Sequence, residues 1–183
     1  MFRTYVTAMA ALFFGITAAR GDIAQCACDP LDPGTAKRRE CSLCREADKQ
    51  PAGIEVFYLK DNNPRKPNRW LVLPRVHTPA GHSLEDLTPK QRTMLWKAAI
   101  QKATELWGDD WGLAYNGDRV RTQCHAHVHI GKLLKGLAAG KTMIVSRPED
   151  IPAPGGKGLW IHPYGKKLMV HYGETITETV LLR

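Results

Sequence analysis

Apolar positions along the chain follow two periods, which predict a sheet and one long helix. Apolar residues alternate or run together over 54–59 and 69–74, around a turn-forming Pro- and Asn-rich loop, so both segments are predicted strands. Over 88–107 they recur at spacings of three and four, and Thr88, Pro89 and Gln91 provide a capping box and an N-terminal proline. Further strands are predicted over 111–117, 124–131, 159–162 and 167–171, around Val145 and near 177–182.

This order of elements predicts an α+β fold, with a mostly antiparallel sheet covered by one long helix. The length of 183 residues suits one domain with a real core. We expect a signal peptide over 1–21, an irregular Cys-rich N-terminal extension over 22–52 and a catalytic domain over 53–140. A β-rich C-terminal tail over 141–183, with a hairpin turn at Tyr164-Gly165, should pack on the same domain.

The first 21 residues have the pattern of an export signal. Arg3 precedes an apolar run from Val6 to Ala19, and Ala19-Arg20-Gly21 offers small residues for cleavage before Asp22. The run is shorter than the roughly 20 residues that a membrane-spanning helix needs. A lipoprotein is less favoured, because Gln25 is bulky where a lipid-attachment box requires a small residue. We therefore expect a periplasmic or secreted protein.

The charge balance favours anionic partners. The formal net charge is +8, and it becomes +6 once the two arginines of the predicted signal are removed. Such a chain attracts phosphorylated small molecules or an anionic membrane surface. No stripe of aromatic and basic residues is present, which disfavours nucleic acid as the main partner.

Four cysteines form a compact group in the N-terminal extension. Cys26-x-Cys28 and Cys41-x-x-Cys44 have spacings that could hold a tetrahedral zinc ion, whereas export favours disulfides. In either case we expect a structural staple. Cys124, far along the chain, is expected to be a buried free thiol.

Three histidines stand at alternate positions in "CHAHVHIG", residues 124–131. On a strand, His125, His127 and His129 would share one side in steps of about 7 Å. The outer two would lie about 13 to 14 Å apart, too far to share one metal ion, so at most two neighbours could bind one. A purely structural role is disfavoured, because three buried imidazoles need three sets of hydrogen-bond partners. The row instead suits an extended substrate that the middle histidine attacks.

The same stretch resembles the signature of the histidine triad (HIT) superfamily, His-φ-His-φ-His-φ-φ with φ apolar, although Gly131 is small rather than apolar. The flanks agree in order: "RWLVLPRVHTPAGHSLEDLT" resembles the strand, Pro and His segment before the family helix, and "LAYNG" the strand that ends in Asn. The resemblance covers roughly residues 54–135. "RTQCHAHVHI" is also similar to the Arg-Thr-Gln-x-His-x-His-x-His of bacterial CDP-diacylglycerol pyrophosphatases.

The resemblance implies hydrolysis or transfer at a nucleotide α-phosphate through a covalent nucleotidyl-histidine, with no metal required for the chemistry. It implies His127 as the nucleophile, with its second ring nitrogen held by a backbone carbonyl. The remaining implied residues contact phosphate, leaving group or substrate, or support the triad: His125, His129, Thr122, Asn116, His77, Arg121 and Gln123. His82 matches no motif, and we expect it at the surface. His162 and His171 lie on either side of the predicted hairpin turn, where they could face the active site or a metal, although exposure is the favoured expectation.

Three functions stay open at this point. The first is a HIT-type hydrolase whose substrate is a nucleotide-containing small molecule or a nucleotide-lipid. The second is a non-catalytic nucleotide- or metal-binding protein with the same fold. The third is a zinc enzyme that uses two triad histidines with His77 or His82. The resemblance also allows a homodimer, and many HIT proteins join a Cys-x-x-Cys to histidine on a structural zinc.

Overall fold

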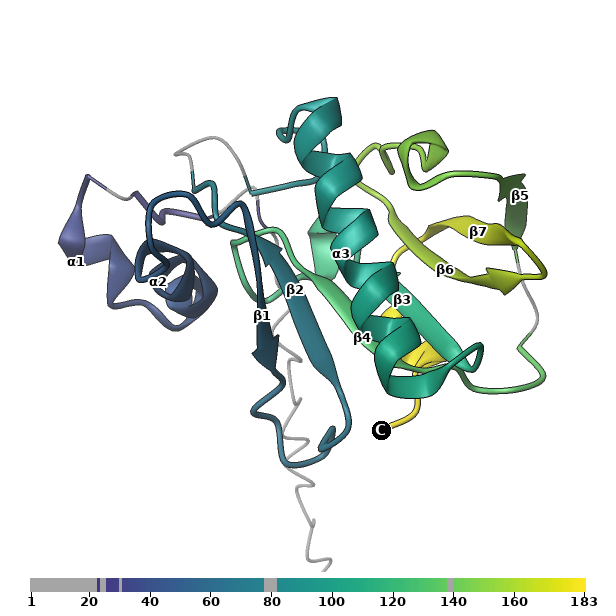
Figure 1. Cartoon of the computed structure of the whole chain (residues 1–183). Helices are drawn as coiled ribbons and strands as arrows, with labels where there is room; N and C mark the ends of the chain where they lie inside the picture. The colour runs from purple at the N-terminus through teal and green to yellow at the C-terminus, as the bar shows by residue number, and fades with distance from the viewer. Residues whose placement is uncertain (1–22, 24–25, 30, 78–81, 138–139) are drawn as a thin grey trace, which may run out of the picture.

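The computed structural model describes residues 23, 26–29, 31–77, 82–137 and 140–183. Its strands are β1 (Val56–Lys60), β2 (Trp70–Pro74), β3 (Trp111–Tyr115), β4 (Val128–Lys132), β5 (Lys141–Val145), β6 (Gly158–Tyr164) and β7 (Lys167–Glu174). They form one sheet in the order β1-β2-β4-β3-β6-β7-β5, in which every pairing is antiparallel (Figure 1). The predicted α+β class with an antiparallel sheet is confirmed.

The long helix α3 (Pro89–Trp107) covers one face of the sheet (Figure 1). Its predicted start is confirmed, because Thr88 Oγ1 accepts from the Gln91 amide at 3.3 Å and Gln91 Oε1 accepts from the Thr88 amide at 2.8 Å. Buried residues of α3 meet the sheet in the main core, which includes Leu95, Trp96, Ala99, Leu113, Val128, Ile130, Leu159 and Ile161. This face is therefore closed by apolar packing.

The opposite face of the sheet is covered in separate pieces. At one end α2 (Ser42–Asp48) packs through Leu43 and Ala47 on apolar residues of β1 and β2. In the middle, Val180 and Leu181 from the C-terminal segment cover Ala114 and Trp160. Because α2 and the C-terminal segment leave parts of this face uncovered, the polar residues of β4 and β6 there can reach a pocket.

Three elements differ from the sequence predictions. The N-terminal extension is not irregular, since it contains α1 (Pro33–Ala36), η2 (Arg39–Cys41) and α2. The segment near 177–182 is not a strand. It forms the 3-10 turn η5 (Glu178–Val180) and a single bridge between Leu133 and Leu181, because its backbone turns to cover the sheet instead of joining it.

The triad strand is also shorter than predicted. β4 begins at Val128, so His125 and His127 precede the strand and only His129 lies within it. The remaining short 3-10 turns are η3 (Asp118–Val120) and η4 (Pro148–Asp150). The predicted signal peptide, 1–21, lies outside the described residues. Within the described ranges, no helix combines the length and the apolar character that crossing a membrane requires.

Candidate functional site

A pocket of about 420 Å³ lies on the face of the sheet opposite α3. Its walls come from α2, from the loop between β1 and β2, from the segment between β3 and β4, and from η5. Among the residues predicted from the sequence, the pocket is lined by Asn116, Arg121, Thr122, Gln123, His127 and His129. His125 and His77 are not among the described lining residues.

His127 is held with one ring nitrogen available. Its Nδ1 lies 2.8 Å from the carbonyl oxygen of His125, so Nδ1 must carry the proton and donate it. The neutral ring then keeps a lone pair on Nε2. Burial, followed by the charges of His129 and Arg121, lowers the pKa of His127 to about 3. His127 is therefore neutral at pH 7, and the predicted carbonyl acceptor is confirmed.

His129 lies edge-on to His127, with ring centroids 5.0 Å apart and planes at 75°. Its Nδ1 is 3.7 Å from Glu178 Oε2, which is near enough for attraction once the ring gains a proton. Burial lowers the pKa of His129 to about 4, although Glu178 acts in the opposite direction. The ring is neutral in the free protein, and the carboxylate beside it favours protonation when negative charge reaches the pocket.

His125 points into the interior. Its Nε2 donates to the Pro74 carbonyl at 2.7 Å, its ring meets His77 edge-on at 5.7 Å, and the residue is fully buried. Burial lowers its pKa to about 3. The three histidines therefore do not form the single row expected from a strand. His125 reaches the site through its backbone carbonyl, which orients His127.

Arg121 gives the pocket a buried positive charge. Its guanidinium stacks 4.9 Å from the Tyr115 ring centre, and Nη2 donates to Asp118 at 3.0 Å. Nε and Nη1 are buried and have no protein partner among the described residues. Unpaired buried guanidinium donors are costly, and an anion such as phosphate would satisfy them.

Asn116 and Gln123 line the pocket but are partly engaged elsewhere. Asn116 Oδ1 accepts from the backbone amides of Thr177 and Glu178 at 2.9 and 3.1 Å, which anchors the C-terminal segment. Gln123 Oε1 accepts from Ser42 Oγ at 2.6 Å, which ties the segment to α2. Thr122 is exposed, so its hydroxyl is accessible from the pocket.

Five charged residues of the pocket were not expected from the sequence: Glu46, Lys60, Asp61, Lys66 and Glu178. Lys66 and Glu178 line it, form an ion pair with each other, and are joined by Arg69, whose Nη1 donates to Glu178 at 2.9 Å. Burial raises the pKa of Glu178, but the nearby His129, Lys66 and Arg69 outweigh it and lower the pKa to about 2. Lys66 lies in a loop whose sequence indicates only a turn, and Glu178 lies far along the chain in the C-terminal tail. No local sequence pattern therefore links the two residues.

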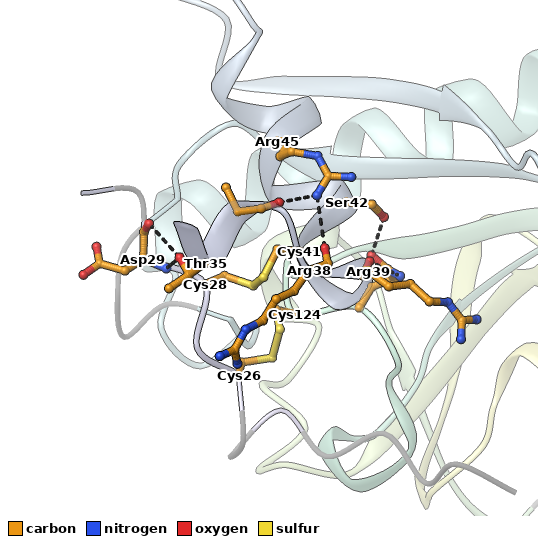
Figure 2. Close-up of a disulfide and its surroundings, with 12 residues drawn as sticks. Cys26, Cys28, Asp29, Thr35, Arg38, Arg39, Cys41, Ser42, Arg45 and Cys124 are labelled. Carbon is orange, nitrogen blue, oxygen red and sulfur yellow. Dashed lines mark hydrogen bonds between the residues drawn. A yellow bond between two sulfur atoms is a disulfide. The ribbon is translucent and has the colours of Figure 1, made fainter. Parts of the chain in front are cut away.

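The cysteines pair differently from the prediction (Figure 2). Disulfides join Cys26 to Cys124 and Cys28 to Cys41, while Cys44 is a buried free thiol. The expectation that Cys124 is a free thiol is wrong, because the fold brings the N-terminal extension onto the segment just before the triad. With Cys28 and Cys41 paired, a zinc site made of the four N-terminal cysteines is not present.

A second polar cluster lies beside the triad. One ligand atom each from Cys44, His77 and His82 lie within 4.8 Å of one another. His82 is only 6% exposed, so the prediction of a surface residue is wrong, and neither of its ring nitrogens has a partner among the described residues. His77 Nδ1 contacts Asp48 at 3.2 Å, while its Nε2 is likewise unpaired. A thiol and two imidazoles with unused nitrogens fit a metal ion of the zinc type.

Comparisons with protein-family models and with curated proteins gave no match for this chain.

Proposed function

We propose that this chain is an exported HIT-type enzyme that cleaves or transfers at the α-phosphate of a nucleotide-containing substrate, in the manner of CDP-diacylglycerol pyrophosphatases. The observation that carries the proposal is His127: a neutral ring on the pocket wall whose Nδ1–H is fixed by the His125 carbonyl, which leaves Nε2 as a nucleophile. The two disulfides agree with an oxidising compartment.

In this mechanism, the Nε2 lone pair of His127 attacks the α-phosphorus. The Nε2–P bond forms as the bond from phosphorus to the leaving oxygen breaks, and that oxygen takes a proton from His129 or from solvent. The ring of the intermediate carries positive charge, which the hydrogen bond from Nδ1 to the His125 carbonyl stabilises. For hydrolysis, water then attacks phosphorus and gives its proton to His129 or to solvent, and the Nε2–P bond breaks to restore neutral His127.

The other residues act on charge and position. Arg121 offers two unpaired donors to phosphate oxygens, and Lys66 adds a second positive charge on the pocket wall. Thr122 presents a hydroxyl to the same space. We assign His125 a positioning role instead of the phosphate contact implied by the resemblance, because its side chain is committed to Pro74.

The test removes the nucleophile and then tries to restore it. His127→Gly should lower hydrolysis of nucleotide phosphoramidates, dinucleoside polyphosphates and CDP-diacylglycerol by about 10³-fold or more. Added imidazole should recover part of the activity, since a free ring can occupy the vacated space. Lys97→Ala, which changes an exposed residue of α3, is the matched control and should keep full activity.

Mass spectrometry of the wild-type protein, quenched during turnover, should show a nucleotidyl adduct on His127. Undiminished activity of His127→Gly would rule out the nucleophile. No activity in the wild type on any substrate of the panel, together with binding of nucleotides, would favour the non-catalytic alternative. The panel also separates a lipid-linked substrate from a soluble one.

We also propose a structural zinc ion held by Cys44, His77 and His82. The unused nitrogens of both histidines and the buried thiol support it. Burial, followed by the charge of Asp48, raises the pKa of Cys44 to about 12, so the metal would have to deprotonate this thiol. Bound zinc would join α2 to the segment after β2 and would take no part in the reaction.

Metal analysis separates this structural role from a zinc enzyme. Purified wild-type protein should contain about one equivalent of zinc more than Cys44→Ala, while the variant keeps its hydrolytic activity at low temperature. Activity that disappears in both proteins with EDTA and returns with zinc would instead favour a zinc enzyme built on the triad. Equal zinc content in the two proteins would exclude Cys44 as a ligand.

A further inference from the structure

A pair of histidines faces a second pocket at the other end of the sheet. His162 on β6 and His171 on β7 place their Nε2 atoms 3.0 Å apart. Both were expected to be exposed, but His171 is only 5% exposed, because Trp160 lies flat against its ring at a centroid distance of 3.4 Å. His171 is therefore packed against Trp160 and bonded to His162, although the proposed reaction assigns no role to these residues.

The position of the pair follows from the register of the sheet. His129 pairs with Ala114, Ala114 with Trp160, and Trp160 with His171, so the four residues form one row across four strands. Directly opposed residues share a face, which places the pair on the same side as the triad and opposite α3. Three strand spacings separate His129 from His171, about 14 Å. Val180 and Leu181 cover the row between them.

The two rings share one hydrogen bond, which a bound cation would replace. His162 Nδ1 lies 2.8 Å from the Pro163 carbonyl, so Nδ1 carries the proton and Nε2 is an acceptor. His171 Nε2–H therefore donates to His162 Nε2 across 3.0 Å, and His171 Nδ1 is buried without a partner among the described residues. A shift of the His171 proton from Nε2 to Nδ1 would free both Nε2 lone pairs for a cation.

The pocket beside the pair is lined by two carboxylates and one lysine, Lys135. The pair lines a pocket of about 300 Å³, whose wall also includes Asp109, Asp110 and Trp160. Asp110 is paired with Lys132 at 3.2 Å, while Asp109 has no ion pair within the described part of the chain. A histidine whose Nδ1–H is fixed by a backbone carbonyl presents Nε2 in the manner typical of metal ligands.

We propose that His162 and His171 form a binding site for a divalent cation of the zinc and copper class. The two Nε2 atoms are the protein's ligands, and water supplies the remaining ligands from the pocket. Imidazole is a preferred ligand of these metals, and two nitrogens 3.0 Å apart are compatible with sharing an ion at bond lengths of about 2 Å. The site is separate from both the triad and the cluster around Cys44.

Calorimetric titration with Zn²⁺ tests the ligands. His162→Ala should bind zinc at least about tenfold more weakly at this site, or lose one equivalent. Lys167→Ala, an exposed change on the same hairpin, should bind as the wild type does. Melting curves without metal check that each variant folds, and His162→Gln replaces the alanine variant if that one is unstable. Zinc binding by a folded His162 variant equal to that of the wild type overturns the proposal.

A second measurement needs no histidine variant. Cu²⁺ bound by the pair would lie beside Trp160 and should quench its fluorescence, so Trp160→Phe should lose the quenching step while still binding the ion. Quenching that is unchanged in Trp160→Phe would place the bound copper elsewhere and contradict the site. The result is independent of hydrolysis, so failure here leaves the proposed function untouched, and loss of the proposed function leaves this site standing.

Discussion

Removing the disulfide between Cys26 and Cys124 should destabilise the protein more than removing its neighbour. The first closes a loop with a sequence separation of 98, and the Cys28–Cys41 disulfide closes one of 13. A crosslink restricts the unfolded chain more when its loop is longer, by about 4.7 kcal/mol near 100 residues and about 3 kcal/mol near 15. The two double variants should therefore differ by about 1 to 2 kcal/mol.

Urea denaturation, followed by circular dichroism, measures this difference. Cys26→Ser with Cys124→Ser should show the lower midpoint, and Cys28→Ser with Cys41→Ser an intermediate one between it and the wild type. Reduced wild-type protein, which lacks both crosslinks, should fall below both. A midpoint for the Cys28–Cys41 variant equal to or below that of the Cys26–Cys124 variant would refute the dominance of loop length.

The longer crosslink should also affect the site. Cys124 directly precedes His125, whose carbonyl holds His127, and the Cys124 amide donates to the Glu40 carbonyl at 2.9 Å. Freed from the disulfide, the segment 124–127 keeps fewer restraints. We expect the Cys26–Cys124 variant to lose turnover in conditions where it is still folded, and the Cys28–Cys41 variant to lose less. Equal turnover in the two folded variants would contradict this coupling.

Two further predictions concern pH and backbone packing. Because burial lowers the pKa of the triad histidines to about 3 or 4, the unfolded chain binds protons below pH 6.5 that the folded chain does not. Stability is therefore complete above pH 6.5 and should fall by about 2 kcal/mol per histidine at pH 5; a flat urea midpoint from pH 8 to 5 would contradict this. Gly158→Ala should cost about 1 to 3 kcal/mol, since its Cβ would lie 2.7 Å from Thr177 Cγ2 and 2.9 Å from the Tyr115 oxygen. Gly140→Ala, whose Cβ meets nothing nearer than 3.9 Å, is its control, and equal melting temperatures would refute the packing argument.

The elements that could be predicted from the sequence are those whose signals lie within one short segment. The capping box and the apolar spacing place α3, and alternation places the central strands, because each signal lies within one segment. The start of β4 had no such signal. Residues 124–127 alternate as a strand would, but Cys124 is tied to Cys26 and Glu40, and His125 to Pro74, all far away in sequence.

In the candidate site, too, local sequence signals indicate some residues, whereas contacts between distant segments place the others. The motif indicated His127, and the carbonyl acceptor for its ring followed from the chemistry of a neutral nucleophile. The ion pair of Lys66 with Glu178 and the burial of His82 and His171 depend on how loops and the C-terminal segment meet the sheet. Lone histidines and turn lysines are usually solvated, so composition alone favoured the wrong environment for the two histidines.

Two walls of the pocket come from segments that lie far apart in the sequence, α2 and the C-terminal segment. One face of the sheet is sealed by α3, whereas the other is closed by α2 and by the C-terminal segment, and the pocket lies between these two pieces. Gln123 bonds to Ser42 on one side, and Asn116 anchors Glu178 on the other. The proposed nucleophile, His127, is thus fixed by a residue close to it in sequence, while two of the pocket walls come from α2 and from the C-terminal segment. Changes in either terminal segment should therefore alter substrate choice, which KM reports, more than the chemistry at His127.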